Sequence, residues 1–253
     1  MTLSSFFGHD LDMSRSAQMW TIHHVILVFF AIVAIVVTLF LALKIKAREN
    51  EKQIRYIYIG LLLILELAYH VHNWTAPLDI RLERGLSVPL HVCSFAVFMN
   101  VALLYTNSKK VFNYAFVFGT VGGIMALIMP NSLGYTYLNF RYYHFILLHM
   151  IILSVPVYYY KAYNYRMNYK EILHIFKSAV LLGIVVYILN GFLGTNYWFI
   201  RYIPSNVDGW FPNWNVYIIT FIGTVFFTMN VLYLVSNYDT IFKKKDKAIK
   251  TTI

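Results

Sequence analysis

Cys93 and His149 are the two residues whose types and positions suit nucleophilic chemistry. Each lies a few residues inside an apolar stretch, one starting near residue 88 and the other near residue 142. A free thiol is mostly protonated at neutral pH and needs a base to act, and an imidazole suits that task. His91 is an alternative base, although at two residues' spacing on a helix it should face away from Cys93. Because a lone cysteine also packs well in an apolar core, both interpretations of Cys93 stay open.

Glu66 and His70 form a second candidate site. Helical geometry places residues four apart on one face, and Asn73 continues the same face three residues later. Ionisable groups within an apolar stretch are costly unless they line a cavity or contact a partner. This stripe predicts a substrate-binding or proton-relay site, or a structural polar seam between helices. Glu51 is expected to lie in a solvated loop instead.

Membrane-spanning helices must position these side chains. Of the 253 residues, 59% are hydrophobic and 13% are charged, whereas about 25% of residues are charged in soluble domains. A span needs about 20 apolar residues, so seven spans with short loops fill the chain as a single transmembrane domain, residues 1–253. The predicted fold is an all-α integral membrane bundle of about seven helices. Its spans lie near 22–43, 55–76, 88–106, 111–130, 142–160, 174–193 and 215–236.

Lysine and arginine residues predict how the bundle is oriented. Counted over alternate loops and the C-terminal tail, sixteen of them fall on one side and five, Arg141 among them, on the other. Since basic residues concentrate in cytoplasmic loops, the N-terminus is predicted outside and the C-terminus in the cytoplasm, as in a multi-pass protein of the cell membrane. The same asymmetry explains the net charge of +10, and no nucleic-acid partner is expected.

Histidines gather on the predicted outer side. Seven of the nine lie in the outer half of the membrane or at its rim; His24, His70, His91, His144 and His149 are among them. Histidines that only served interface solubility would be scattered over both faces, so the clustering favours a shared polar site. A zinc hydrolase is a less favoured alternative, because no His-x-x-x-His pair occurs and no Asp lies in a span. Neither a metal nor another cofactor is expected.

Four segments together resemble YwaF-like bacterial membrane proteins, which are related to the transmembrane protein 164 family. They are Val88-Pro89-Leu90-His91-Val92-Cys93; Gly122-Gly123-Ile124 running to Met129-Pro130; Tyr142-Tyr143-His144-Phe145-Ile146-Leu147-Leu148-His149; and Asn190 with Gly194-Thr195-Asn196-Tyr197, Pro204 and Trp210-Phe211-Pro212. Their order covers roughly residues 85 to 215, and His23 with His24 extends the match. Val88 and Val92 stand where the family usually has Leu.

The resemblance implies an enzyme that works on lipids. The family's animal branch is described as a cysteine-dependent phospholipid acyltransferase with an acyl-thioester intermediate. By resemblance, Cys93 would be the nucleophile, His149 or His91 its base, and phospholipid or another lipid acyl ester the substrate. Transfer and hydrolysis of the acyl group are both consistent with it. Asn190, Asn196 or Tyr197 could donate hydrogen bonds to the oxyanion, and Glu66, His70, His144 and His24 are the other expected substrate-binding residues.

Two other functions remain in view. A transporter or a substrate-binding membrane subunit would use a polar site centred on Glu66 and His70. Against a transporter, the polar residues stop at the predicted outer half of the membrane, and no inner polar chain completes a path. A purely structural or assembly role is the third alternative.

Overall fold

The structure is a computed structural model that describes residues 3–9, 20–128, 135–205 and 207–239. Met129, Pro130 and the lysines of the C-terminal tail, all used in the sequence analysis, lie outside these ranges. The described residues fold into helices, as expected for an all-α protein. They are α1 (Leu3–Phe6), α2 (Ile22–Lys46), α3 (Glu51–Trp74), α4 (Leu78–Arg84), α5 (Val92–Thr106), α6 (Lys109–Ile128), α7 (Phe140–Ala162), α8 (Tyr169–Leu193), the 3-10 turns η1 (Tyr197–Phe199) and η2 (Asp208–Trp210), and α9 (Trp214–Ser236).

Six of these helices are long and apolar enough to cross a membrane: α2, α3, α6, α7, α8 and α9. Each matches a predicted span, with ends that differ by a few residues. The remaining predicted span, near 88–106, corresponds to α5, which has only 15 residues. At 1.5 Å per residue α5 is roughly 22 Å long, shorter than the ~30 Å hydrocarbon core of a bilayer. The prediction of a membrane protein with several apolar helices is confirmed.

The start of α5 differs from the predicted span, which began at residue 88. Pro89 cannot donate a backbone hydrogen bond and disfavours helical geometry at the residue before it. His91 is still extended, with φ −65° and ψ 151°, and acts as the N-cap of α5. Cys93 is therefore the second residue of a helix that starts inside the bundle. Such irregular backbone at membrane depth is tolerated where protein or a cavity surrounds it.

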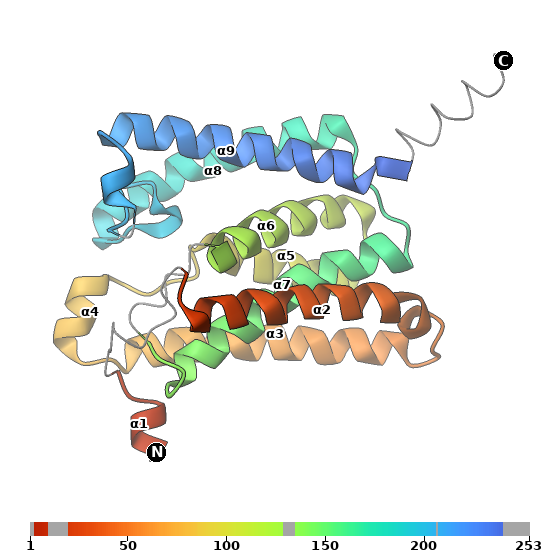
Figure 1. The fold of residues 1–253 in the computed structure, drawn as a ribbon, viewed down its shortest axis with the longest axis horizontal. Coiled ribbons are helices and arrows are strands. Elements are labelled where there is room, and N and C mark those ends of the chain that lie inside the picture. Colours follow the sequence, from red (N-terminus) through yellow and green to blue (C-terminus); the bar gives the residue numbers. More distant parts are fainter. Residues whose placement is uncertain (1–2, 10–19, 129–134, 206, 240–253) are drawn as a thin grey trace.

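Two groups of helices make up the bundle (Figure 1). In the first group, α5 packs on α3, α6 and α7, while α2 packs on α7 and α6. In the second, α8 and α9 pack on each other, and both contact α6. Figure 1 shows this α8–α9 hairpin running along one side of the other helices. We call the end of the bundle that carries His91, Asn139 and Gly194 the outer end, since the sequence predicts it to face outside.

A proline in α7 ties the three central helices together. Pro156 has no N–H to offer the carbonyl of Ile152, four residues earlier. Asn100 of α5 donates its Nδ2 hydrogen to that carbonyl instead, at 3.3 Å. On the α6 side, a Cβ at Gly119 would lie 2.6 Å from the same Ile152 oxygen, so only glycine permits this approach. The contact fixes α5 against α7, the helices that carry Cys93 and His149.

Glu51 is not solvated, in contrast to the expectation from sequence. It is the first residue of α3, and its side chain is only 12% exposed. The hydroxyls of Tyr158 and Tyr163 both donate to Oε1 at 2.9 Å, and Arg55 donates to Oε2 at 3.1 Å. Burial, followed by this bond to Glu51, raises the pKa of Tyr163 to about 12. The cluster closes the end of the bundle opposite to Cys93.

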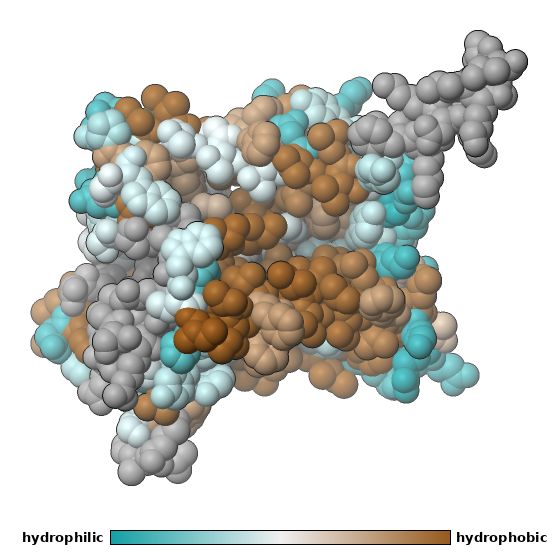
Figure 2. All heavy atoms as spheres, viewed as in Figure 1, coloured by the Kyte–Doolittle hydropathy of each residue, from teal (hydrophilic) through white to brown (hydrophobic). Residues whose placement is uncertain are grey.

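The surface agrees with a membrane environment. Large apolar side chains are exposed along several helices, including Phe29 and Phe40 on α2 and Ile184 on α8. Figure 2 shows apolar residues covering the middle of the helices, with hydrophilic residues mainly toward their ends. Such extensive apolar exposure is unusual for a soluble protein and is expected where lipid contacts the helices.

Candidate active site

Cys93 of α5 and His149 of α7 lie in hydrogen-bonding contact. The Sγ atom is 3.0 Å from Nε2 of the imidazole, and His149 is 4% exposed. The other ring nitrogen, Nδ1, is 2.7 Å from the carbonyl oxygen of Phe145. Because a carbonyl can only accept, Nδ1 carries the proton, and Nε2 is left to accept the thiol hydrogen. This is the tautomer that a base for Cys93 requires.

The first turn of α5, which contains Cys93, carries unused backbone donors. The first intrahelical hydrogen bond runs from the N–H of Phe95 to the carbonyl of His91. The N–H groups of Val92, Cys93 and Ser94 have no acceptor within the described part of the chain, and the His91 side chain makes no capping bond. A helix N-terminus of this kind carries a partial positive charge and attracts an anion.

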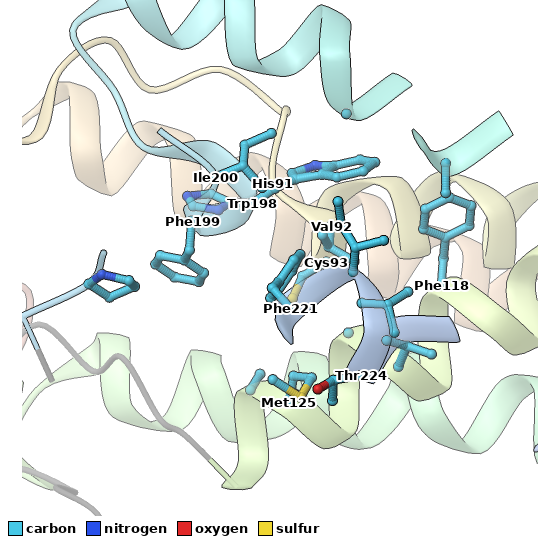
Figure 3. A pocket seen from close by; sticks show the side chains of 18 of the residues that line it. His91, Val92, Cys93, Phe118, Met125, Trp198, Phe199, Ile200, Phe221 and Thr224 are labelled. Carbon is cyan, nitrogen blue, oxygen red and sulfur yellow. The ribbon is translucent and has the colours of Figure 1, made fainter. Parts of the chain in front are cut away.

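A cavity of about 620 Å³ lies beside the cysteine, between the α8–α9 hairpin and helices α5, α6 and α7. Most of its wall is apolar. Figure 3 looks into it and shows Cys93, Phe118 and Phe221 around the same space, with Trp198 and Phe199 contributed by η1. The polar residues of the wall include Glu66, Tyr69, His91, Ser94, Arg141, His144 and His149, together with three threonines of α9.

Arg141 lines the cavity, although its position just before the predicted span 142–160 favoured an outer loop. It is 9% exposed, its NH1 donates to Nδ1 of His144 at 2.6 Å, and its guanidinium lies 4.5 Å from the ring centre of Tyr69. Nε2 of His144 in turn donates to the carbonyl of Leu65 at 2.7 Å. The spacing of Arg141 and His144, three residues on one helix face, was the sequence signal for this pair.

Glu66 and His70 form a hydrogen-bonded pair, with Nε2 of His70 3.2 Å from Oε1 of Glu66. Both residues are buried. On the other side of the ring, Nδ1 is 3.0 Å from the hydroxyl of Ser87, to which Asn73 also donates at 3.1 Å. Ser87 was not identified from the sequence. Glu66 lines the cavity, while His70 points away from it toward the 85–91 segment.

Asn190 organises the turn that follows α8. Its Oδ1 accepts from the Thr195 hydroxyl and from the N–H of Tyr197, both at 2.8 Å, and its Nδ2 donates to the carbonyl of Tyr197 at 2.9 Å. Gly194 ends the helix in the left-handed region, with φ +63°, where glycine is unstrained. Both polar atoms of the Asn190 side chain are therefore bonded within the turn, and Asn190 does not line the cavity.

That turn holds the segment leading into α5. The hydroxyl of Tyr197 donates to the carbonyl of Leu86 at 2.6 Å and accepts from the N–H of Val88 at 2.9 Å. Burial raises the pKa of Tyr197 to about 12, so the donor proton is retained at neutral pH. The indole of Trp198 donates to the carbonyl of Leu90 at 2.7 Å. Asn190 and Tyr197 thus fix the position of the helix that begins beside Cys93.

Trp198 and Phe199 adopt an uncommon backbone conformation. Their φ values are +61° and +57°, a region that costs a residue with a Cβ about 1–2 kcal/mol. Both side chains contribute to the cavity wall. Strained residues of this kind often lie at functional sites, where surrounding contacts hold them in place.

The structure brings some of the predicted site residues together and separates others. Cys93, His149, His91, Glu66 and His144 line one cavity. His91 therefore shares it with Cys93, because an N-cap residue does not follow the helical spacing that predicted it to face away. The residues that do not line it are His24, His70, Asn190, Asn196 and Tyr197.

His24 and Asn196 have contacts of their own. His24 bonds through Nε2 to the carbonyl of Leu127 at 2.7 Å and accepts at Nδ1 from the N–H of Trp20. Asn196 donates to the carbonyl of Tyr202 and accepts from the N–H groups of Arg201 and Tyr202. Across the described residues, no group of three His, Cys, Asp or Glu side chains is arranged to hold a metal ion.

Comparison with known proteins matches most of the chain to a family model. The model of the TMEM164 family matches residues 19–233. This range includes Cys93, His149 and all of the cavity wall. No curated protein and no solved structure matches the chain.

Proposed function

The chain belongs to the TMEM164 family, and from that premise we propose that it is a membrane-embedded enzyme that transfers lipid acyl groups through a thioester on Cys93. The observation that carries this proposal is the 3.0 Å contact between Cys93 Sγ and His149 Nε2 at the wall of an apolar cavity. A packed core cysteine does not require a histidine whose tautomer is fixed to accept its proton. A nucleophile does.

The first half-reaction acylates the cysteine. The thiol proton passes to Nε2 of His149, and the sulfur attacks the carbonyl carbon of a lipid ester. Collapse of the tetrahedral intermediate breaks the ester C–O bond, and the departing alkoxide takes the proton back from His149. The products are an acyl thioester on Cys93 and a lipid with a free hydroxyl. His149 acts first as base and then as acid, as its single available nitrogen allows.

The oxyanion of the intermediate forms next to the first turn of α5. Backbone N–H groups of Cys93 and Ser94 have no acceptor in the described structure and support its negative charge. Removing one such donor costs about 10²–10³ in rate in other enzymes. This differs from the assignment made from sequence, because the polar atoms of Asn190, Asn196 and Tyr197 are committed to loop contacts.

The second half-reaction releases the acyl group to an acceptor. A hydroxyl, from a second lipid in transfer or from water in hydrolysis, gives its proton to His149 and attacks the thioester carbonyl. The C–S bond then breaks, and the Cys93 sulfur recovers the proton. The apolar wall favours a lipid over water as acceptor, because it excludes water from the thioester. Phospholipids of the outer leaflet of the cell membrane are the substrates that the predicted orientation supplies.

A transporter centred on Glu66 and His70 is the second candidate. The observation in its favour is that Glu66 lines the cavity. The opposite end of that cavity is lined by Phe176, Val225, Thr228 and Met229. The Thr228 hydroxyl donates to the Thr224 carbonyl of its own helix at 2.8 Å, and no ionisable residue continues the path among these wall residues. His70 is held by Glu66 and Ser87 outside the cavity. The arrangement supports acyl transfer better.

An acyl-transfer assay tests the proposal. Purified protein in vesicles of phosphatidylethanolamine and phosphatidylglycerol would be mixed with a labelled lysophospholipid acceptor, and formation of the labelled diacyl product followed. Wild-type protein should form product, while Cys93→Ala and Cys93→Ser should both lose it without loss of folded protein. Full activity of Cys93→Ala would exclude a covalent intermediate on this cysteine.

A further inference from the structure

We infer that the cavity is an acyl-chain groove and that two small residues of α8, Ala179 and Gly183, set the longest acyl group that Cys93 can take. This inference rests on the proposed function, because the occupant is the acyl chain of the thioester. It goes beyond that function by naming the residues that select the substrate by chain length.

The groove exists because small residues face it from two sides. On α8 these are Ala179 and Gly183, one turn apart, and on α6 they are Gly122 and Ala126, also one turn apart. The volume of about 620 Å³ is within the range of about 300–1,000 Å³ found for small-molecule sites. A larger side chain at Ala179, Gly183 or Ala126 would occupy the space directly, whereas a Cβ at Gly122 would lie 2.9 Å from the wall residue Val92.

Contacts across the cavity show how far it extends past the cysteine. A Cβ at Gly183 would lie 3.8 Å from the Trp198 ring, and Trp198 is bonded to Leu90 just before α5. Gly183 is therefore near the level of Cys93. From Gly183 the wall continues along α8 toward its N-terminus as far as Phe176. The two residues are seven positions apart, which is roughly 10 Å of helix. Ala179 lies between, roughly 6 Å past Gly183.

Phe176 closes the far end. Its ring lies 4.8 Å from that of Phe226, and Met229, fully buried, completes the end wall. An acyl chain attached at Cys93 would thus run away from the polar wall of Glu66, His91 and Arg141 and toward a closed apolar end. A lipid ester has the same arrangement, with its polar ester group at one end and its apolar chain extending away from it.

The groove also opens sideways to where lipid would be. Val180, Ile184 and Ile222 belong to its wall and are 39%, 55% and 40% exposed. A lipid chain could enter between the helices without crossing water. This side opening, the closed far end and the adjacent Cys93–His149 pair all fit an acyl chain as the occupant.

Acylation of Cys93 by p-nitrophenyl esters tests the inference, since each acylation releases one p-nitrophenolate. The readout is the ratio of the rate with the palmitoyl ester to the rate with the butyryl ester. Ala179→Phe should lower this ratio about tenfold or more, the scale on which pockets discriminate chain length. Ala179→Val should lower it less. Phe176→Ala, which opens the far end, should raise the rate with the longer stearoyl ester relative to palmitoyl.

Ile219→Phe is the matched control. Ile219 is on α9, is 71% exposed and does not line the cavity. The Ile219→Phe variant should therefore keep the wild-type ratio of palmitoyl to butyryl rates. The groove would be overturned, with the thioester mechanism left intact, if Ala179→Phe had the same palmitoyl-to-butyryl ratio as Ile219→Phe and Phe176→Ala kept the wild-type stearoyl-to-palmitoyl ratio. If wild-type protein releases no more p-nitrophenolate than Cys93→Ala with any ester, the proposed function and this inference both fall.

Discussion

The sulfur of Cys93 lies 3.0 Å from Nε2 of His149, although the two residues are 56 positions apart and belong to different helices. The hydrogen bond from Asn100 to Ile152, which Pro156 makes available, holds those helices together. The Asn190 turn, through Tyr197 and Trp198, fixes where α5 begins. The geometry of the pair is therefore supported from both sides by residues of which only Trp198 lines the cavity.

Replacing His149 by Ala should slow acylation of Cys93 strongly. General-base help is worth roughly 10²–10⁴ in rate, so a loss of that size is expected in ester-driven p-nitrophenolate release. His174→Ala serves as the control, because His174 is an exposed residue of α8 near its other end. If His149→Ala keeps the wild-type rate, another group removes the thiol proton, and His91 becomes the first to test.

Glu66→Gln should destabilise the protein. It removes the charge that accepts from His70 in a buried pair, and hydrogen bonds to charged groups contribute about 1.5–3 kcal/mol. The change in unfolding free energy can be measured by denaturant titration in detergent. Glu49→Gln is the control, since Glu49 is exposed and surface changes are usually within about 0.5 kcal/mol. Similar stabilities of the two variants would mean that the pair contributes little.

Tyr197→Phe should reduce both stability and acylation. Loss of the hydroxyl removes its two part-buried hydrogen bonds, to the Leu86 carbonyl and from the Val88 N–H, each of which contributes about 0.5–1.5 kcal/mol. Acylation falls as well because the start of α5 is less well fixed. Tyr202→Phe, at a 56% exposed position, should change neither quantity. A stable Tyr197→Phe variant with wild-type acylation would contradict the positioning role.

The predicted orientation can be tested by labelling single cysteines in a Cys93→Ser background. An impermeant maleimide applied to intact cells should label Tyr202→Cys, in the loop after α8, and should not label Lys110→Cys, at the start of α6. Both positions are exposed in the structure, so a buried side chain would not explain a lack of labelling at either one. Labelling of position 110 alone would reverse the topology and would put the cavity near the inner leaflet.

Apolar runs were enough to predict the helices, because burial in lipid constrains composition over a whole span. The start of α5 was missed by four residues, since hydropathy does not register that Pro89 delays the helix. Arg141 was counted as a loop charge because a sequence does not show whether a residue in the first turn of a helix points outward or into the bundle. Asn190 and Tyr197 were expected to donate to the oxyanion, but in the structure their partners are loop atoms that only the fold brings close.

The mass of the purified protein, before and after incubation with phosphatidylethanolamine and phosphatidylglycerol vesicles, tests the central claim most directly. The account predicts an added mass equal to one long-chain acyl group, located on the peptide that contains Cys93 and removed by neutral hydroxylamine, which cleaves thioesters. The adduct should be absent from Cys93→Ala and should accumulate more slowly in His149→Ala. An unmodified Cys93, in protein that nevertheless transfers acyl groups between lipids, would contradict the account.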